Sequence, residues 1–329
     1  MRTSPRKKLP IGIQNLREIR EGGYYYVDKT TFACQLDAAG KYYFLSRPRR
    51  FGKSLFVDTL KELFEGNRKL FAGLHAEHHW DWSKTHPVIR ISFGEGKLDS
   101  RAQLREKILE ILRKAQEEFG VTCLNKSISG IFMELIEGCH KQHGRTAVVL
   151  VDEYDKPILD NISEPEVAAQ MREGLKDLYS VLKGADPHLR FVFVTGVSKF
   201  SKVSLFSGLN NLVDITLDPQ TSALCGYTET DVDEVFAPEL PGLDREEIRR
   251  WYNGYNWTGE AVYNPFDLLL FFHFREFRPW WYETGNPSFL LELLRERNTF
   301  LPDLSRLVTG EALLSTFDVE HIAVEALLF

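Results

Sequence analysis

The chain has 329 residues, of which 43% are hydrophobic, and its formal net charge at pH 7 is −6. This composition suits one large or two modest globular domains, and the negative charge excludes a general attraction to nucleic acid or anionic membrane. The four cysteines lack C-x-x-C spacing, which argues against a disulfide framework or a zinc ribbon. The most apolar run, 266–274, is far shorter than the roughly 20 residues of a membrane-spanning helix. We therefore expect a cytoplasmic protein with no membrane partner.

The N-terminal part contains a basic tail and a tyrosine-rich segment. Residues 1–10 carry no apolar stretch behind their basic side chains, which predicts a disordered tail and no signal peptide. Residues 24–27 are three tyrosines and a valine. They could flank a purine base, since purine rings stack well on aromatic and apolar side chains. A β-prone segment packed on a sheet explains the same residues, and both interpretations stay open.

The next stretch combines a strand, a turn and a helix. Residues 42–45 are aromatic or leucine and predict a short buried strand, whereas apolar periodicity from Leu55 to Phe64 predicts a helix. The turn between them ends in Gly-Lys-Ser at 52–54. Backbone N–H groups of such a turn point at the β- and γ-phosphates of a nucleoside triphosphate. Lys53 would add a point charge there, and the Ser54 hydroxyl would complete the coordination of Mg²⁺.

The turn departs from the full phosphate-loop pattern G-x-x-x-x-G-K-[ST] at its first position, which is Arg47. A residue with a Cβ cannot turn there as freely as glycine, so the start of the loop must differ. Arg49 or Arg50 could pair with phosphate oxygens or point to solvent, and we leave both alternatives open. The residues expected to bind the nucleoside triphosphate are Pro48, Arg49, Arg50, Phe51, Gly52, Lys53, Ser54 and Leu55.

The middle of the chain predicts further strands and helices. Residues 88–93 indicate a second strand, and Ser100 with Gln103 indicates a capping box that opens a helix. Another helix follows over 131–139. Histidines gather at 75–79 and at 140–143, without the cysteine or carboxylate pair that a metal site would need. We therefore expect no metal site at either group.

A second motif lies about a hundred residues after the Gly-Lys-Ser turn. The apolar run 146–151 predicts a strand covered on both faces, and it ends in Asp152-Glu153. Such an end puts carboxylates at the edge where open α/β sheets bind ligands. Asp152 would reach the Mg²⁺ shell, typically through water. Glu153 is placed to polarise an attacking water as general base. An acidic pair that merely ends a strand is the alternative, and the order of the two motifs disfavours it.

After an amphipathic helix over 167–182, the run 191–194 predicts another buried strand, which ends in Thr195. In proteins that bind a nucleoside triphosphate through such a turn, a polar residue at that place often senses the γ-phosphate. Thr195 occupies it, with Ser198 as an alternative, and a hydroxyl that simply ends a strand is equally compatible. Residues 214–217 indicate a last strand. Alternating strands and helices predict a parallel sheet with right-handed crossovers.

From Leu224 onward the sequence shows no further strand-like runs. Thr228 and Asp231 mark the start of a helical region. The dense aromatics over 251–257 could stack on single-stranded nucleic acid. Because no basic residues lie between the rings, the core of a small lid is the better interpretation. The chain ends on the mainly apolar segment 324–329 without a cap, which suggests a truncated protein.

Several of these stretches resemble the bacterial and archaeal AAA-ATPase-like family. They are "YYYVDKTTF", "RPRRFGKSLF" and "VVLVDEYDKPI", together with "SGLNNLVDITLD", "WYNGYNW" and "VYNPFDLL" further on. A loop without its first glycine belongs to that family's own pattern. The resemblance implies ATP binding and hydrolysis. It also implies that a PD-(D/E)XK nuclease-like domain follows the ATPase region in full-length relatives.

These observations predict an α/β fold with a P-loop NTPase core, in which helices flank a parallel sheet. We expect the core over 11–222 and a mainly helical lid or winged-helix-like region over 223–329, apparently truncated before a nuclease-like domain. The expected cofactors are ATP and Mg²⁺. Nucleic acid and oligomeric partners are left open.

The predicted catalytic residues are Lys53, Glu153 and Thr195, and the predicted metal ligands are Ser54 and Asp152. A nucleotide-gated switch, which would hydrolyse ATP slowly and signal through the lid, uses the same residues. A scaffold without nucleotide is disfavoured because these side chains are intact. A P-loop kinase is disfavoured because Glu153 beside Asp152 suits the activation of water.

Overall fold

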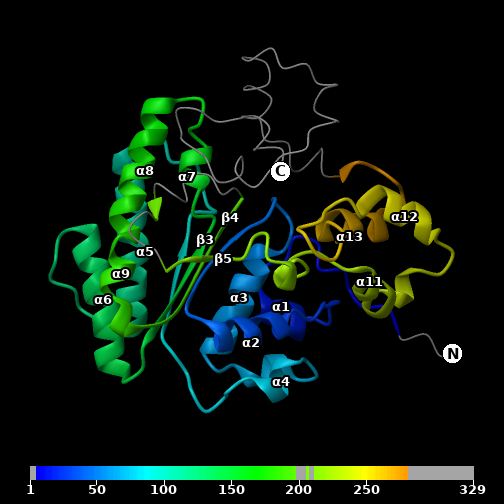
Figure 1. Ribbon diagram of the computed structural model, residues 1–329, viewed down its shortest axis with the longest axis horizontal. Helices are drawn as coiled ribbons and strands as arrows, with labels where there is room; N and C mark the ends of the chain where they lie inside the picture. Colours follow the sequence, from blue (N-terminus) through cyan, green and yellow to red (C-terminus); the bar gives the residue numbers. More distant parts are fainter. Residues whose placement is uncertain (1–4, 198–204, 207–210, 281–329) are drawn as a thin grey trace. The chain divides into compact units, whose positions relative to one another are not determined.

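A computed structural model describes residues 5–197, 205–206 and 211–280 of the chain (Figure 1). These residues form two compact units. The first unit combines the described residues up to Val88 with those from Val213 to Trp280, and the second comprises the described residues from Ile89 to Leu212. The units therefore divide the chain differently from the expected boundary after residue 222.

The first unit contains two strands and several helices around them. Its strands β1 and β5 pair in parallel, with Tyr43 opposite Val213 and Phe44 opposite Asp214. Its elements are α1 (Leu16–Glu21), α2 (Thr30–Ala39), β1 (Tyr42–Ser46), α3 (Lys53–Phe64), η1 (Arg68–Phe71), α4 (Ala76–His79), β5 (Val213–Asp214), η3 (Pro219–Thr221), α11 (Glu229–Val235), η4 (Ala237–Glu239), α12 (Arg245–Tyr252) and α13 (Pro265–Phe274).

The second unit contains strands in the order β2-β3-β4 and the helices that flank them. Strands β3 and β4 pair in parallel over five residue pairs. The elements are β2 (Val88–Ser92), α5 (Arg101–Phe119), α6 (Ile128–His143), β3 (Ala147–Asp152), α7 (Lys156–Leu159), α8 (Pro165–Tyr179), α9 (Val181–Gly184), η2 (Asp186–His188) and β4 (Leu189–Gly196). Every residue of β3 is buried, as expected for a strand covered on both faces.

The described strands belong to a five-stranded sheet, and helices flank it. The predicted α/β class with a P-loop NTPase-like core is therefore confirmed. Local signals in the sequence explain much of this structure. The Ser100 hydroxyl accepts a hydrogen bond from Gln103 N at the start of α5, and the capping box of Thr228 and Asp231 opens α11.

The helical part of the first unit has its own apolar core. Helices α11, α12 and α13 bury Val232, Ile248 and Phe271 in one cluster, together with Tyr25 from the N-terminal segment. The neighbouring residues 8–10 are not part of a disordered tail. Lys8 forms a parallel bridge with Tyr24, and Pro10 is buried. This is a correction to the expected tail, because backbone pairing with a distant segment supplies the order that the local composition does not indicate.

None of the helices among the described residues is long and apolar enough to cross a membrane.

Candidate functional site

The Gly-Lys-Ser turn lies between a buried strand and a buried helix, as predicted. β1 ends at Ser46, and α3 begins at Lys53 with Gly52 as its N-cap. Gly52 has φ 90° and ψ 13°, a left-handed conformation that glycine adopts without a steric cost. A Cβ at this position would meet no atom within 4 Å. The backbone angle, rather than a lack of space, is therefore what favours glycine here.

The side chain of Lys53 is buried inside this turn. Its Nζ donates hydrogen bonds to the carbonyl oxygens of Arg47 and Pro48, both at 2.9 Å. The ammonium thus lies at the start of α3, where backbone N–H groups without a helical partner also gather. Both features favour an anion at this place. Ser54, the next residue, is half-buried on the first turn of α3.

Arg47, which stands where the usual pattern has its first glycine, anchors the loop. Its side chain is 1% exposed, and its backbone does not adopt a left-handed conformation. Nη1 donates to Ser46 O at 2.9 Å and to Thr216 O at 2.7 Å, and Nη2 donates to Thr221 O at 3.2 Å. The guanidinium also lies 4.1 Å from the ring centroid of Trp257. Burial lowers the pKa of Arg47 to about 10.

We expect Arg47→Met to lower the free energy of unfolding by about 3 kcal/mol, because it removes the guanidinium donors to three carbonyl oxygens. Urea denaturation would measure this loss. Arg49→Met, at an exposed neighbour in the same loop, is the matched control and should change stability by less than about 0.5 kcal/mol. Equal stability of the two variants would contradict the anchoring role.

Aromatic side chains from a segment about 200 residues further along the chain also support the loop. Phe51 is 1% exposed. Its ring centroid lies 4.6 Å from that of Tyr255 and 5.2 Å from that of Trp257, in edge-to-face arrangements. The sequence assigned these aromatics to the core of a lid. Tyr252 does lie in the helical core, but Tyr255 and Trp257 contact the loop between β1 and α3, a role that no local signal indicated.

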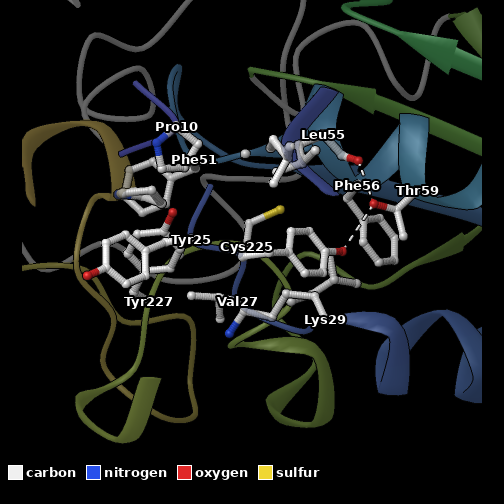
Figure 2. A pocket seen from close by; sticks show the side chains of 16 residues that line it. Pro10, Tyr25, Val27, Lys29, Phe51, Leu55, Phe56, Thr59, Cys225 and Tyr227 are labelled. Atoms are coloured by element: carbon white, nitrogen blue, oxygen red, sulfur yellow. Dashed lines mark hydrogen bonds between the residues drawn. The ribbon is translucent and has the colours of Figure 1, made fainter. Parts of the chain in front are cut away.

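A mainly apolar pocket lies beside the loop within the same unit (Figure 2). Its volume is about 60 Å³, and it opens to solvent. Figure 2 shows Tyr25 and Val27 of the N-terminal segment, Leu55 and Phe56 of α3, and Cys225 around it. The complete lining is Pro10, Ile19, Tyr25, Tyr26, Val27, Lys29, Phe51, Gly52, Leu55, Phe56, Thr59, Leu224, Cys225, Gly226, Tyr227 and Pro265.

Few polar groups face this pocket. The Thr59 hydroxyl donates to Leu55 O at 2.8 Å and lies 3.4 Å from the Tyr26 hydroxyl. Lys29 Nζ is paired with Asp231 Oδ2 at 2.6 Å. An apolar pocket with a small number of polar groups suits a flat ring system, which it would orient through those groups.

The Asp-Glu motif lies at the end of β3 in the second unit. Asp152 is 2% exposed, and its Oδ2 lies 3.9 Å from Arg90 Nη2 on β2. Its Oδ1 is buried and has no hydrogen-bond partner among the residues that the structure describes. A buried carboxylate oxygen without a partner is costly. A bound cation or an ordered water would satisfy it.

Glu153 ends the extended strand. Its φ is 54°, in the left-handed region that residues with a Cβ rarely adopt. Alternation of side chains along β3 therefore stops at this residue. The Glu153 carboxylate reaches towards the end of β2, since a Cβ built at Gly94 would lie 3.3 Å from Glu153 Oε2 and 3.5 Å from Ser92 Oγ. Such strained residues concentrate at functional sites.

Thr195 lies on the neighbouring strand and is fully buried near the end of β4. Its carbonyl oxygen accepts a hydrogen bond from Tyr154 N at 3.1 Å, which joins the ends of β3 and β4. Asp155, a further carboxylate at this edge, accepts from Val197 N with both oxygens, at 3.2 and 3.1 Å. Ser198, the alternative to Thr195, lies outside the described residues.

The structure thus brings the predicted residues together in two groups. Lys53 lies against carbonyls of the loop between β1 and α3 in the first unit, whereas Asp152, Glu153 and Thr195 lie at adjacent strand ends in the second. Among the described residues, no three histidine, cysteine or carboxylate side chains form a metal-binding cluster.

Asp267, near the start of α13, is a buried carboxyl that no local signal in the sequence indicated. It is 2% exposed, and burial raises its pKa to about 7, while the positive charge of Arg50 opposes this shift. Tyr252 and Tyr255 also interact electrostatically with it. Burial raises the pKa of both tyrosines above its usual value of about 10, so neither tyrosine titrates between pH 4 and pH 8.

This raised pKa predicts a specific pH dependence of stability. Between about pH 4, the unfolded pKa, and about pH 7, the folded protein holds the Asp267 proton more tightly than the unfolded chain. Its contribution to stability is therefore present below pH 4 and is lost as the pH rises to 7. Relative to the parent, Asp267→Asn should gain up to about 4 kcal/mol in unfolding free energy over this range.

Urea denaturation of both proteins at several pH values would measure this difference. Glu246→Gln, at an exposed carboxyl of α12, is the control and should show a much flatter difference. A flat difference for Asp267→Asn as well would contradict the raised pKa.

Comparison with known proteins adds two findings. The sequence model of the family described as "Predicted AAA-ATPase" matches residues 10–206. A curated protein of Azotobacter chroococcum mcd 1, named "Uncharacterized protein in vnfD 5'region", is 62% identical over 325 residues. The match covers 98% of this chain but 63% of that relative, so the chain spans less than two thirds of the relative's length.

Proposed function

The chain belongs to the predicted AAA-ATPase family, and from that premise we propose that it binds ATP with Mg²⁺ and hydrolyses it. The observation that carries the proposal is the loop between β1 and α3. The left-handed Gly52 precedes helix α3, and the buried ammonium of Lys53 lies at the N-terminus of this helix. A positive charge at a helix N-terminus suits the β- and γ-phosphates.

Lys53, Ser54 and Asp152 would have separate tasks in binding MgATP. The backbone N–H groups at the start of α3 bind phosphate oxygens, and Lys53 adds its charge to them. Ser54 and Asp152 hold Mg²⁺, which when bound neutralises charge on the phosphate oxygens. Asp152 fits this task because its Oδ1 is buried and has no hydrogen-bond partner among the described residues.

Glu153 and Thr195 supply the chemistry at the strand ends. Glu153 accepts a proton from the attacking water, and its left-handed backbone supports this task because the side chain leaves the regular strand direction. Thr195 contacts the γ-phosphate from the end of β4. What supports both assignments is the shared position of the two residues at adjacent strand ends.

The base of the nucleotide would enter the apolar pocket beside the loop. The pocket includes Gly52 and Leu55 of the loop and helix, so a nucleotide held there by its phosphates lies within reach of it. Tyr25 and Val27 supply apolar contacts, as the tyrosine-rich segment suggested. This supports the base-flanking interpretation over the purely structural one.

A measurement of Mg²⁺-dependent ATP binding and turnover by this chain tests the proposal, with and without DNA or RNA. Turnover of about 1 s⁻¹ or faster would support an ATPase. Tight binding with turnover slower by several orders of magnitude would support the nucleotide-gated switch. No binding would overturn both. Coupling to a nuclease-like domain stays a proposal that rests on the family resemblance, and stimulation by DNA or RNA would support it.

A further inference from the structure

Three side chains of the phosphate loop contact one distant segment, residues 255–267. Arg47 stacks on Trp257, and Phe51 packs on Tyr255 and Trp257. The guanidinium of Arg50 lies 4.0 Å from the ring centroid of Phe266. The segment overlaps two stretches, "WYNGYNW" and "VYNPFDLL", to which the proposed function assigns no task.

Arg50 is the residue in the loop whose backbone depends most on its surroundings. Its φ is 67°, a left-handed conformation. For a residue with a Cβ this conformation is disfavoured by roughly tenfold or more relative to the right-handed one. It persists only where neighbouring structure holds it. The next left-handed residue, Gly52, needs no such support.

The start of α13 supplies that support. Phe266 presents its ring to the Arg50 guanidinium, and the Asp267 carboxylate attracts the same charge. Asp267 Oδ1 is buried and has no hydrogen-bond partner among the described residues. Its negative charge, when present, attracts the Arg50 guanidinium.

This start of α13 is itself fixed in place. Asn264 caps the helix by accepting a hydrogen bond from Phe266 N at 3.0 Å, and Pro265 occupies the first turn. The following residues, Leu268 and Leu269, are buried in the apolar cluster of the helical part. The capped and packed start of α13 thus contacts Arg50, the arginine of the loop with a left-handed backbone.

We propose that the start of helix α13 positions the phosphate loop, because Phe266 and Asp267 hold the Arg50 side chain and thereby its left-handed backbone. This inference rests on the proposed function of the loop in binding phosphate. Arg50, Phe266 and Asp267 are positioning residues in this arrangement. A movement of α13 would then change the affinity for ATP. Helices α11, α12 and α13 could therefore regulate nucleotide binding through the Arg50 backbone.

The first test compares two replacements at position 50. Arg50→Ala loses the contact with Phe266 and keeps the cost of the left-handed backbone. Arg50→Gly loses the same contact without that cost. We expect the glycine variant to bind MgATP about 5- to 10-fold more tightly than the alanine variant, measured by titration calorimetry. Equally weak binding by both would mean that the guanidinium contacts phosphate directly, and this would overturn the proposal.

The second test is a double-mutant cycle with Phe266→Leu. In the parent, this replacement removes the ring under Arg50 and should weaken MgATP binding about fivefold. In the Arg50→Gly background it should weaken binding less than twofold, because the glycine no longer needs the ring. Phe274→Leu, half-exposed at the other end of α13, is the matched control and should show no coupling to position 50. The same loss in both backgrounds would overturn the proposal.

A stability measurement without nucleotide separates this inference from the proposed function. The urea midpoint of unfolding is measured for each variant of the same double-mutant cycle. Arg50→Gly should be more stable than Arg50→Ala, and Phe266→Leu should lower the midpoint less in the Arg50→Gly background than in the parent. If the parent does not bind MgATP, the proposed function fails, and the unfolding cycle alone decides whether α13 holds the loop. Absence of coupling in that cycle would overturn it.

Discussion

Lys53→Ala should abolish Mg²⁺-dependent ATP binding and leave the protein folded. The replacement removes the positive charge that lies inside the phosphate loop, together with its hydrogen bonds to Arg47 O and Pro48 O. Charge-assisted contacts of this kind are roughly twice as strong as neutral ones. We therefore expect the affinity for MgATP to fall by about 100-fold or more, as measured by titration calorimetry.

Lys61→Ala is the matched control for this prediction. Lys61 lies on the same helix, α3, and its ammonium pairs with Glu65 Oε2 at 2.9 Å. The Lys61→Ala variant loses a positive charge of the same type away from the loop, so its affinity for MgATP should stay within about twofold of the parent. A folded Lys53→Ala protein that binds MgATP as tightly as Lys61→Ala would remove the loop from the nucleotide site.

Glu153→Gln should separate catalysis from binding. The glutamine keeps the size of the side chain and tolerates the left-handed backbone as glutamate does, but it cannot accept the proton of the attacking water. Loss of a positioned general base typically costs about 10²–10⁴-fold in rate. The variant should therefore bind MgATP as the parent does and hydrolyse it at least about 100-fold more slowly in a steady-state phosphate-release assay.

Two neighbouring carboxylates provide contrasts for this result. Asp152→Asn should weaken the Mg²⁺-dependent part of ATP binding, because it removes charge from the expected metal ligand. Asp155→Asn should mainly lower stability, since both Asp155 oxygens accept a hydrogen bond from Val197 N. Parental turnover in Glu153→Gln would mean that the base is another residue, and Asp155 would then be the next to test by rate.

The sequence alone determined the elements whose signals are local. The apolar runs before Gly52 and before Asp152 predicted β1 and β3, and both strands are fully buried. Capping residues marked the starts of α5 and α11. These signals succeed because periodicity and capping involve residues within one or two turns of each other. The same local patterns placed the Gly-Lys-Ser turn at a helix N-terminus and the acidic pair at a strand end.

Only the tertiary structure decided what supports the phosphate loop. Arg47 reaches carbonyl oxygens at 216 and 221, and Arg50 meets a ring at 266, more than 160 residues along the chain. No local pattern encodes such contacts. The long segment between two contacting residues could bring its ends together in many alternative pairings at a similar entropic cost. The raised pKa of Asp267 has the same origin. It depends on burial, and burial is a property of the packed unit rather than of the sequence around the residue.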